Sequence, residues 1–80
     1  MLFLIEYNRA SGEIVEMRTF DDSLRSVAED ARLELELRLN REGVEHEVVL
    51  LEAPSEEALR HTHGRYFESL AEIAREKLTA

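Results

Sequence analysis

A long stripe of apolar residues with helical spacing, placed between two strand-like segments, constrains the fold of this chain most. From Leu24 to about Glu42, apolar side chains recur every three or four residues, and Gly43 follows as a natural helix end. Asp21, Asp22 and Ser23 precede the stripe and can accept hydrogen bonds from the first helical amides. The apolar members are Leu24, Val27, Ala28, Ala31, Leu35 and Leu39. The pattern predicts one amphipathic helix.

The segments on either side of this helix have the composition of strands. Leu2 to Tyr7 and Glu13 to about Thr19 are rich in bulky apolar residues. Asn8 to Gly12, which separates them, has the turn chemistry of a β-hairpin. Val44 to Leu51 predicts a third strand, which ends before Pro54.

The C-terminal third of the chain shows a second helical pattern. Ser55 is a suitable N-cap, with Glu56 and Glu57 in the first turn. The stripe beyond it consists of Leu59, His63, Tyr66, Leu70 and Ile73. This stripe stays in helical phase through Gly64 and favours one long or kinked helix. Because a glycine weakens a helix by about 1 kcal/mol, a short helix that ends at His63 is the alternative.

The resulting order of elements, β-β-α-β-α, restricts the topology. A helix that links two parallel strands must cross over the sheet, and the simplest sheet then places the first strand in the middle. We therefore expect a three-stranded antiparallel sheet of order 2-1-3, with both helices on one face. The predicted fold class is an α+β two-layer sandwich, and residues 1–80 are expected to form a single domain.

Composition excludes several classes of function. The chain has 80 residues, a formal net charge of −8 and no cysteine, so it can form no disulfide, thiolate metal site or thiol nucleophile. The acidic balance disfavours nucleic-acid binding, which depends on Lys and Arg. The longest apolar run, Met1 to Ile5, is far shorter than the about 18 residues of a membrane span and has no basic residue before it, unlike a signal peptide. We expect a soluble cytoplasmic protein without nucleic-acid or membrane partners.

Two apolar surfaces are left over by this fold. Leu33 and Leu37 lie about 180° from the core stripe of the first helix. Either the C-terminal helix packs against them, or they contact another subunit. Leu2 and Leu4 point to the opposite side of the first strand from Phe3 and would lie on the uncovered sheet face. Because small domains without disulfides often self-associate, these four leucines are candidate interface residues and predict a homodimer.

The charge is concentrated in one part of the chain. Five glutamates and no Lys or Arg lie between Gly43 and Leu59. His46, between two of these glutamates, is interpreted as a surface residue. Directly afterwards comes a basic island, from Arg60 to Tyr66, which has no acidic residue. Its candidate ligand-binding residues are Arg60, His61, His63, Arg65 and Tyr66.

Three interpretations of the basic island are open. Arg60, His61 and Arg65 could bind a carboxylate or phosphate, with the Tyr66 hydroxyl as a further donor. His61 and His63 could bind a metal only if Gly64 breaks the helix, because residues two apart on a helix diverge by about 200°. Alternatively, i,i+4 pairing of the island with Glu56 and Glu57 needs no function at all. The last interpretation requires the fewest assumptions.

The segment from Glu47 to Phe67, EVVLLEAPSEEALRHTHGRYF, resembles a family of small conserved bacterial proteins of unassigned function. Its shared features are the valine- and leucine-rich strand, Ser-Glu-Glu-Ala-Leu-Arg, Thr-His and Arg-Tyr-Phe. The resemblance implies no catalytic or binding residue. The leading hypothesis is therefore a non-catalytic, homodimeric interaction module without cofactor or metal, which a protein partner could join. The alternative is an anion-binding or metal-binding domain, or a minor enzyme, that uses Arg60 to Tyr66.

Overall fold

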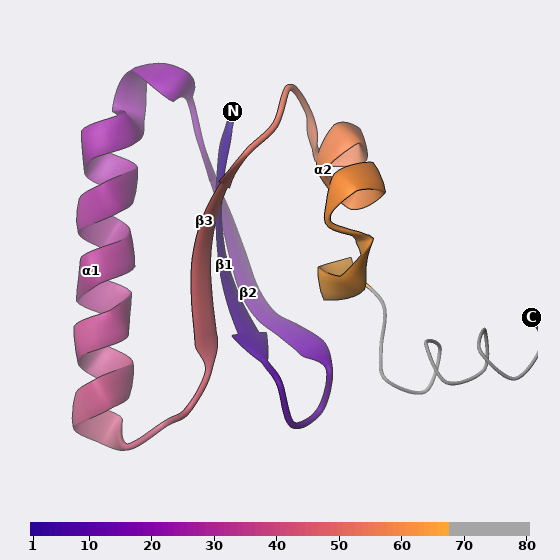
Figure 1. The fold of residues 1–80 in the computed structure, drawn as a ribbon. Coiled ribbons are helices and arrows are strands. Elements are labelled where there is room, and N and C mark those ends of the chain that lie inside the picture. Colours follow the sequence, from indigo (N-terminus) through magenta and orange to yellow (C-terminus); the bar gives the residue numbers. More distant parts are fainter. Residues whose placement is uncertain (68–80) are drawn as a thin grey trace, which may run out of the picture.

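A three-stranded sheet lies between two helical layers in the computed structural model, which describes residues 1–67 apart from the side chain of Arg65 (Figure 1). The strands are β1 (Leu2–Asn8), β2 (Glu13–Phe20) and β3 (Glu47–Glu52), in the order β2-β1-β3. The central strand β1 pairs antiparallel with both neighbours. The predicted α+β fold, the element order β-β-α-β-α and the antiparallel 2-1-3 sheet are therefore confirmed.

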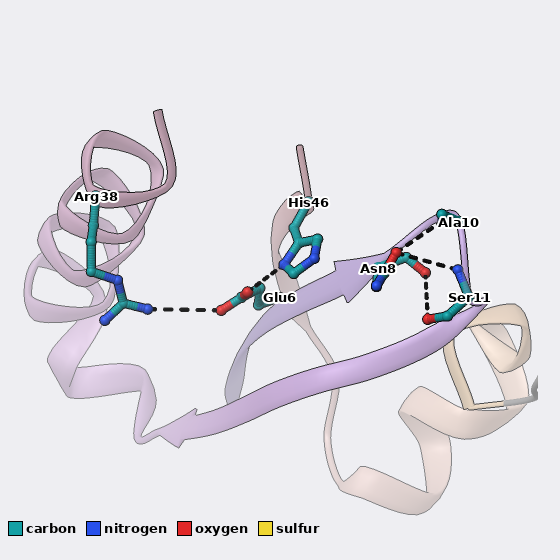
Figure 2. Close-up of polar contacts among 6 residues, drawn as sticks. All are labelled: Glu6, Asn8, Ala10, Ser11, Arg38 and His46. Carbon is teal, nitrogen blue, oxygen red and sulfur yellow. Dashed lines mark hydrogen bonds and ion pairs between the residues drawn. The ribbon is translucent and has the colours of Figure 1, made fainter. Parts of the chain in front are cut away.

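The turn of the β1–β2 hairpin is held by Asn8 and Gly12. The Asn8 side-chain oxygen accepts hydrogen bonds from the backbone N–H groups of Ala10 (3.0 Å) and Ser11 (3.3 Å), as Figure 2 shows. Gly12 has a φ of 73° and donates its N–H to the Asn8 carbonyl at 2.8 Å. An asparagine that bonds its own turn and a glycine with positive φ are the residues that such a turn requires.

The helix α1 (Arg25–Glu42) follows a short 3-10 helix, η1 (Asp22–Leu24). The side chain of Asp21 accepts a hydrogen bond from the backbone N–H of Ser23 at 3.0 Å, which satisfies one of the first unpaired amides. At the other end, Gly43 has a φ of 69°, in the left-handed region that favours glycine. Both predicted ends of this helix agree with the structure within one residue.

The predicted core stripe of α1 is correct over the length of the helix and wrong at its start. The buried or half-buried members are Ala28, Ala31, Leu35 and Leu39. Leu24 and Val27, however, are 44% and 49% exposed. Leu24 precedes α1, in η1, and Val27 is turned about 100° from Ala28 toward the side of the helix.

The two helical layers lie on opposite faces of the sheet, so the expectation of both helices on one face is wrong (Figure 1). One face packs against α1, in a cluster of Leu2, Leu4, Phe20, Ala28 and Ala31. The other face packs against α2 and η2, in a cluster of Phe3, Ile5, Tyr7, Ala53, Leu59 and Tyr66. The molecule therefore has three layers rather than two.

The physical reason for the three layers is the composition of β1. Successive side chains of a strand point to opposite faces, and β1 has large apolar residues at both sets of positions. A central strand of this kind loses burial energy unless both faces are covered. The helix after β3 therefore covers the face that α1 leaves open.

The last described elements are the helix α2 (Glu56–Thr62) and the 3-10 helix η2 (Gly64–Phe67). Ser55 caps α2 by accepting the N–H of Ala58 at 3.1 Å. The favoured long helix is wrong at Gly64, because His63 has a φ of −127° and a ψ of 40°, which ends the α-helix. The rest of the predicted stripe, Leu70 and Ile73, lies outside the described residues.

Candidate functional site

The predicted basic island does not form a single site in the described residues. The Arg60 guanidinium contacts the Glu56 carboxylate at 3.1 Å, one helical turn away. The same guanidinium lies over the Phe67 ring, 4.4 Å from its centre. The Arg60–Glu56 contact matches the interpretation of the island as i,i+4 pairing, and the fold adds a cation–π contact. Among residues 1–67, the corresponding pair of His61 with Glu57 is not formed.

The two histidines of the island differ in environment. His61 is exposed on α2, whereas His63 is half-buried and its ring lies 6.5 Å from that of Tyr66. The helix does end before Gly64, and this was the condition for His61 and His63 to bind one metal ion together. Even so, residues 1–67 contain no group of three or more His, Cys, Asp or Glu side chains placed to hold a metal ion.

Tyr66 is a packing residue. It is buried against the sheet, where its ring meets the Tyr7 ring edge-on at 5.1 Å and 88°. Its hydroxyl donates a hydrogen bond to the Glu47 carboxylate on β3 at 3.3 Å. Tyr66 thus joins η2 to two strands, while the side chain of Arg65, the remaining candidate, lies outside the described part of the chain.

A polar cluster that the sequence does not predict lies on the other face of the sheet. Glu6, on β1, is only 4% exposed, and one of its carboxylate oxygens lies 2.6 Å from Nδ1 of His46 (Figure 2). The other oxygen lies 3.9 Å from the guanidinium of Arg38 on α1. The cluster therefore connects three parts of the fold: β1, α1 and the segment that leads into β3.

The Glu6 cluster contains a carboxylate–histidine pair, which is one part of many acid–base catalytic sites. A carboxylate that holds one ring nitrogen of a histidine leaves the other nitrogen available as a base. A cavity of about 190 Å³ adjoins His46 and is lined by Glu36, Leu39, Asn40, Val44 and Val48. None of these lining residues carries a hydroxyl or thiol nucleophile. The described geometry supports a structural role, in which the cluster compensates a buried charge and fixes α1 over β1.

This cluster could not be predicted from the sequence, because each of its residues has an ordinary interpretation by itself. His46, interpreted as a surface residue, has a side chain that is only 19% exposed. The sequence did contain one signal. Glu6 lies two residues after Leu4 on the same strand, so its side chain points to the same face as Leu2 and Leu4. An acid at such a position of a central strand needs a partner from another element, but pattern analysis does not say which one.

A groove of about 610 Å³ lies between α1 and β2, and its charges are mixed. Arg18, Arg38 and Arg41 line it together with Glu16 and Glu34. Because both signs of charge line the groove, it presents no surface selective for an anion or a cation.

The predicted interface residues fall into two groups. Leu2 and Leu4 are 1% and 2% exposed beneath α1, so the expectation that they form a surface patch is wrong. Leu33 and Leu37 are each 54% exposed on the outer side of α1. The alternative in which the C-terminal helix covers them does not hold for α2, which lies on the far side of the sheet (Figure 1).

Comparisons with known proteins add no relative. No family model, no curated protein and no solved structure matches the chain. Within residues 1–67, no helix is both long and apolar enough to cross a membrane.

Proposed function

We propose that this protein is a non-catalytic interaction module of the cytoplasm that works as a homodimer. The observation that carries the proposal is the α1 ridge, formed by Leu33 and Leu37 one helical turn apart on the side of α1 that faces away from the sheet. A single exposed leucine is common on protein surfaces, but adjacent leucines on an otherwise charged helix form a site where a second apolar surface gains burial. The absence of cysteine suits a reducing compartment.

The proposal is also supported by the size of the chain. An 80-residue domain buries a small fraction of its surface, and this chain has no disulfide to compensate. Dimerisation through the α1 ridge removes exposed apolar area without changing the core. The Glu6 cluster and the packed Tyr66 then serve the rigidity of the module rather than a reaction.

The test is the mass of the full-length protein in solution, measured by light scattering coupled to gel filtration. At about 50 μM, above the micromolar Kd expected of a modest interface, we expect the mass of a dimer. Replacing both ridge leucines by glutamine (Leu33→Gln with Leu37→Gln) preserves helix propensity and is expected to give a monomer.

The matched control is Val27→Gln, which changes an apolar residue of similar exposure on the side of the same helix. This variant is expected to remain dimeric. A wild-type protein that is monomeric at this concentration would refute the proposal, and so would a ridge variant that still dimerises like the wild type.

The alternative function is binding of an anion or a metal by Arg60 to Tyr66. The contacts of Arg60 with Glu56 and Phe67 do not favour it. A thermal-shift panel with divalent metals and phosphorylated compounds separates the two hypotheses. Stabilisation by one compound that disappears in His63→Ala would support the alternative and count against a pure interaction module.

A further inference from the structure

We infer that two copies of α1 pack antiparallel about a two-fold axis that passes between the helices at the level of residue 35. This inference rests on the proposed homodimer and specifies its interface. Leu33 and Leu37 lie two residues on either side of that point. Antiparallel pairing therefore places Leu33 of each copy against Leu37 of the other, so that all four leucines meet at the centre of the contact.

The charges beside the α1 ridge support this orientation. With about 100° of rotation per residue, Asp30 and Arg41 lie on the same side of the ridge, about 40° and 60° from its centre. A two-fold axis perpendicular to both helices brings the side that carries Asp30 and Arg41 against the same side of the second helix. The second helix then runs in the opposite direction. Because Asp30 lies five residues before the axis and Arg41 six after it, each Asp30 comes opposite Arg41 of the second copy.

Both groups are available for such a contact. Arg25, Arg32 and Arg60 each have a carboxylate within 3.0 to 3.2 Å. In residues 1–67, by contrast, neither Asp30 nor Arg41 makes an ion pair, although both are exposed. The second copy would supply the missing partner twice, once at each end of the contact.

The other side of the ridge is compatible with the same register. Glu29 and Asn40 lie about 60° and 40° from the ridge centre, and antiparallel pairing brings the Asn40 amide of one copy near the Glu29 carboxylate of the other. Glu34 is the unfavourable group, since its own copy lies near it across the axis. It is turned about 80° from the ridge centre and so borders the contact rather than filling it.

A parallel arrangement is disfavoured by the same residues. A two-fold axis parallel to the helices brings each side of the ridge against the opposite side of the second copy, so each Asp30 would face Glu29 and each Arg41 would face Asn40 of the other helix. The facing carboxylates of Asp30 and Glu29 repel and cost affinity, whereas the antiparallel arrangement pairs each Asp30 with Arg41 of the second copy.

Spin labelling tests the orientation, because the chain has no cysteine and a single engineered one can be labelled cleanly. In Ser26→Cys, the labelled position lies nine residues before the axis. At 1.5 Å per residue, the two labels of an antiparallel dimer are about 27 Å apart along the helices. Side-by-side parallel helices would place them at about the interhelical distance of 8–10 Å. A short distance in a dimeric sample would overturn the antiparallel arrangement.

Charge reversal tests the register independently. Asp30→Arg and Arg41→Asp are each expected to weaken the dimer about tenfold, and the combined variant to return the Kd to within about threefold of the wild type. Circular dichroism confirms that each variant is folded. A dimer whose combined variant shows no recovery would overturn this arrangement and leave the proposed homodimer standing. A monomeric wild type would overturn both.

Discussion

Glu6 shows how one residue of the central strand depends on partners distant in sequence. Its carboxylate is buried on the α1 side of the sheet and meets His46 at 2.6 Å and Arg38 at 3.9 Å. A buried carboxylate without these groups would bear the full cost of its lost hydration. The cluster thus favours the one arrangement in which α1 and the start of β3 lie on either side of Glu6.

We predict that Glu6→Gln lowers the free energy of unfolding by about 1.5–3 kcal/mol, the usual contribution of a hydrogen bond to a charged group. The substitution keeps the shape of the side chain and removes its charge. Urea unfolding of the purified protein measures the effect. The control is Glu16→Gln, at the exposed position directly opposite Glu6 on β2, for which we expect a change within about 0.5 kcal/mol. Equal effects of the two substitutions would show that the cluster contributes nothing specific.

Asp21 shows a residue-scale effect that depends on pH. The Ser23 hydroxyl, and then the backbone N–H of Ser23, hold the pKa of the Asp21 carboxyl below its ordinary value of 3.8. Because the folded-state pKa is lowered, the stabilisation is complete at neutral pH and is lost as the pH falls below 3.8 through the folded-state pKa.

Ser23→Ala removes the larger of these two interactions. We predict that the wild type is more stable than Ser23→Ala at pH 7, and that the difference shrinks at about pH 3 and below. Urea unfolding at a series of pH values measures the difference. Ser26→Ala, on the first turn of α1, is the control and should show a difference that does not follow this pH dependence. A Ser23→Ala difference that stays constant down to pH 2 would contradict the prediction.

Among the elements of the fold, those whose boundaries depend on a few distinctive residues were predicted correctly from the sequence. The hairpin turn depends on Asn8 and Gly12, and the end of α1 depends on Gly43, which are residues with distinctive backbone requirements. The end of α2 was less predictable. The stripe through Gly64 keeps helical phase, but the chain ends the helix there and Tyr66 packs edge-on against Tyr7. That contact belongs to the tertiary structure and has no counterpart in the local pattern.

The candidate site was predicted less well than the elements. Leu33 and Leu37 were identified because helical phase places them opposite the core. Arg60 and Tyr66 were found as a cluster in the sequence, but their contacts are with Glu56, Phe67, Tyr7 and Glu47 rather than with a common ligand position. A composition bias shows where charge gathers and does not show which contacts use it.

For the whole molecule, the proposed dimer makes thermal stability dependent on protein concentration. A dimer that dissociates on unfolding is stabilised by mass action, so a hundredfold increase in concentration should raise the Tm by roughly 5–10 °C. Scanning calorimetry of the wild type at low and high concentration measures the shift. In the Leu33→Gln, Leu37→Gln variant we expect a constant Tm. A wild-type Tm independent of concentration would contradict the homodimer.

The order of elements, the ends of α1 and the outward position of Leu33 and Leu37 could be predicted from the sequence, because each follows from local backbone chemistry or from periodicity along one element. The strand order 2-1-3 followed from the crossover that a helix between parallel strands requires. Three features became evident only in the folded molecule: the helices cover opposite faces of the sheet, Leu2 and Leu4 are core residues, and Glu6 contacts His46 and Arg38. The reason is that β1 is apolar on both faces. Such a strand is stable only when helices bury both of its faces, but its sequence pattern does not show which helix packs on which face.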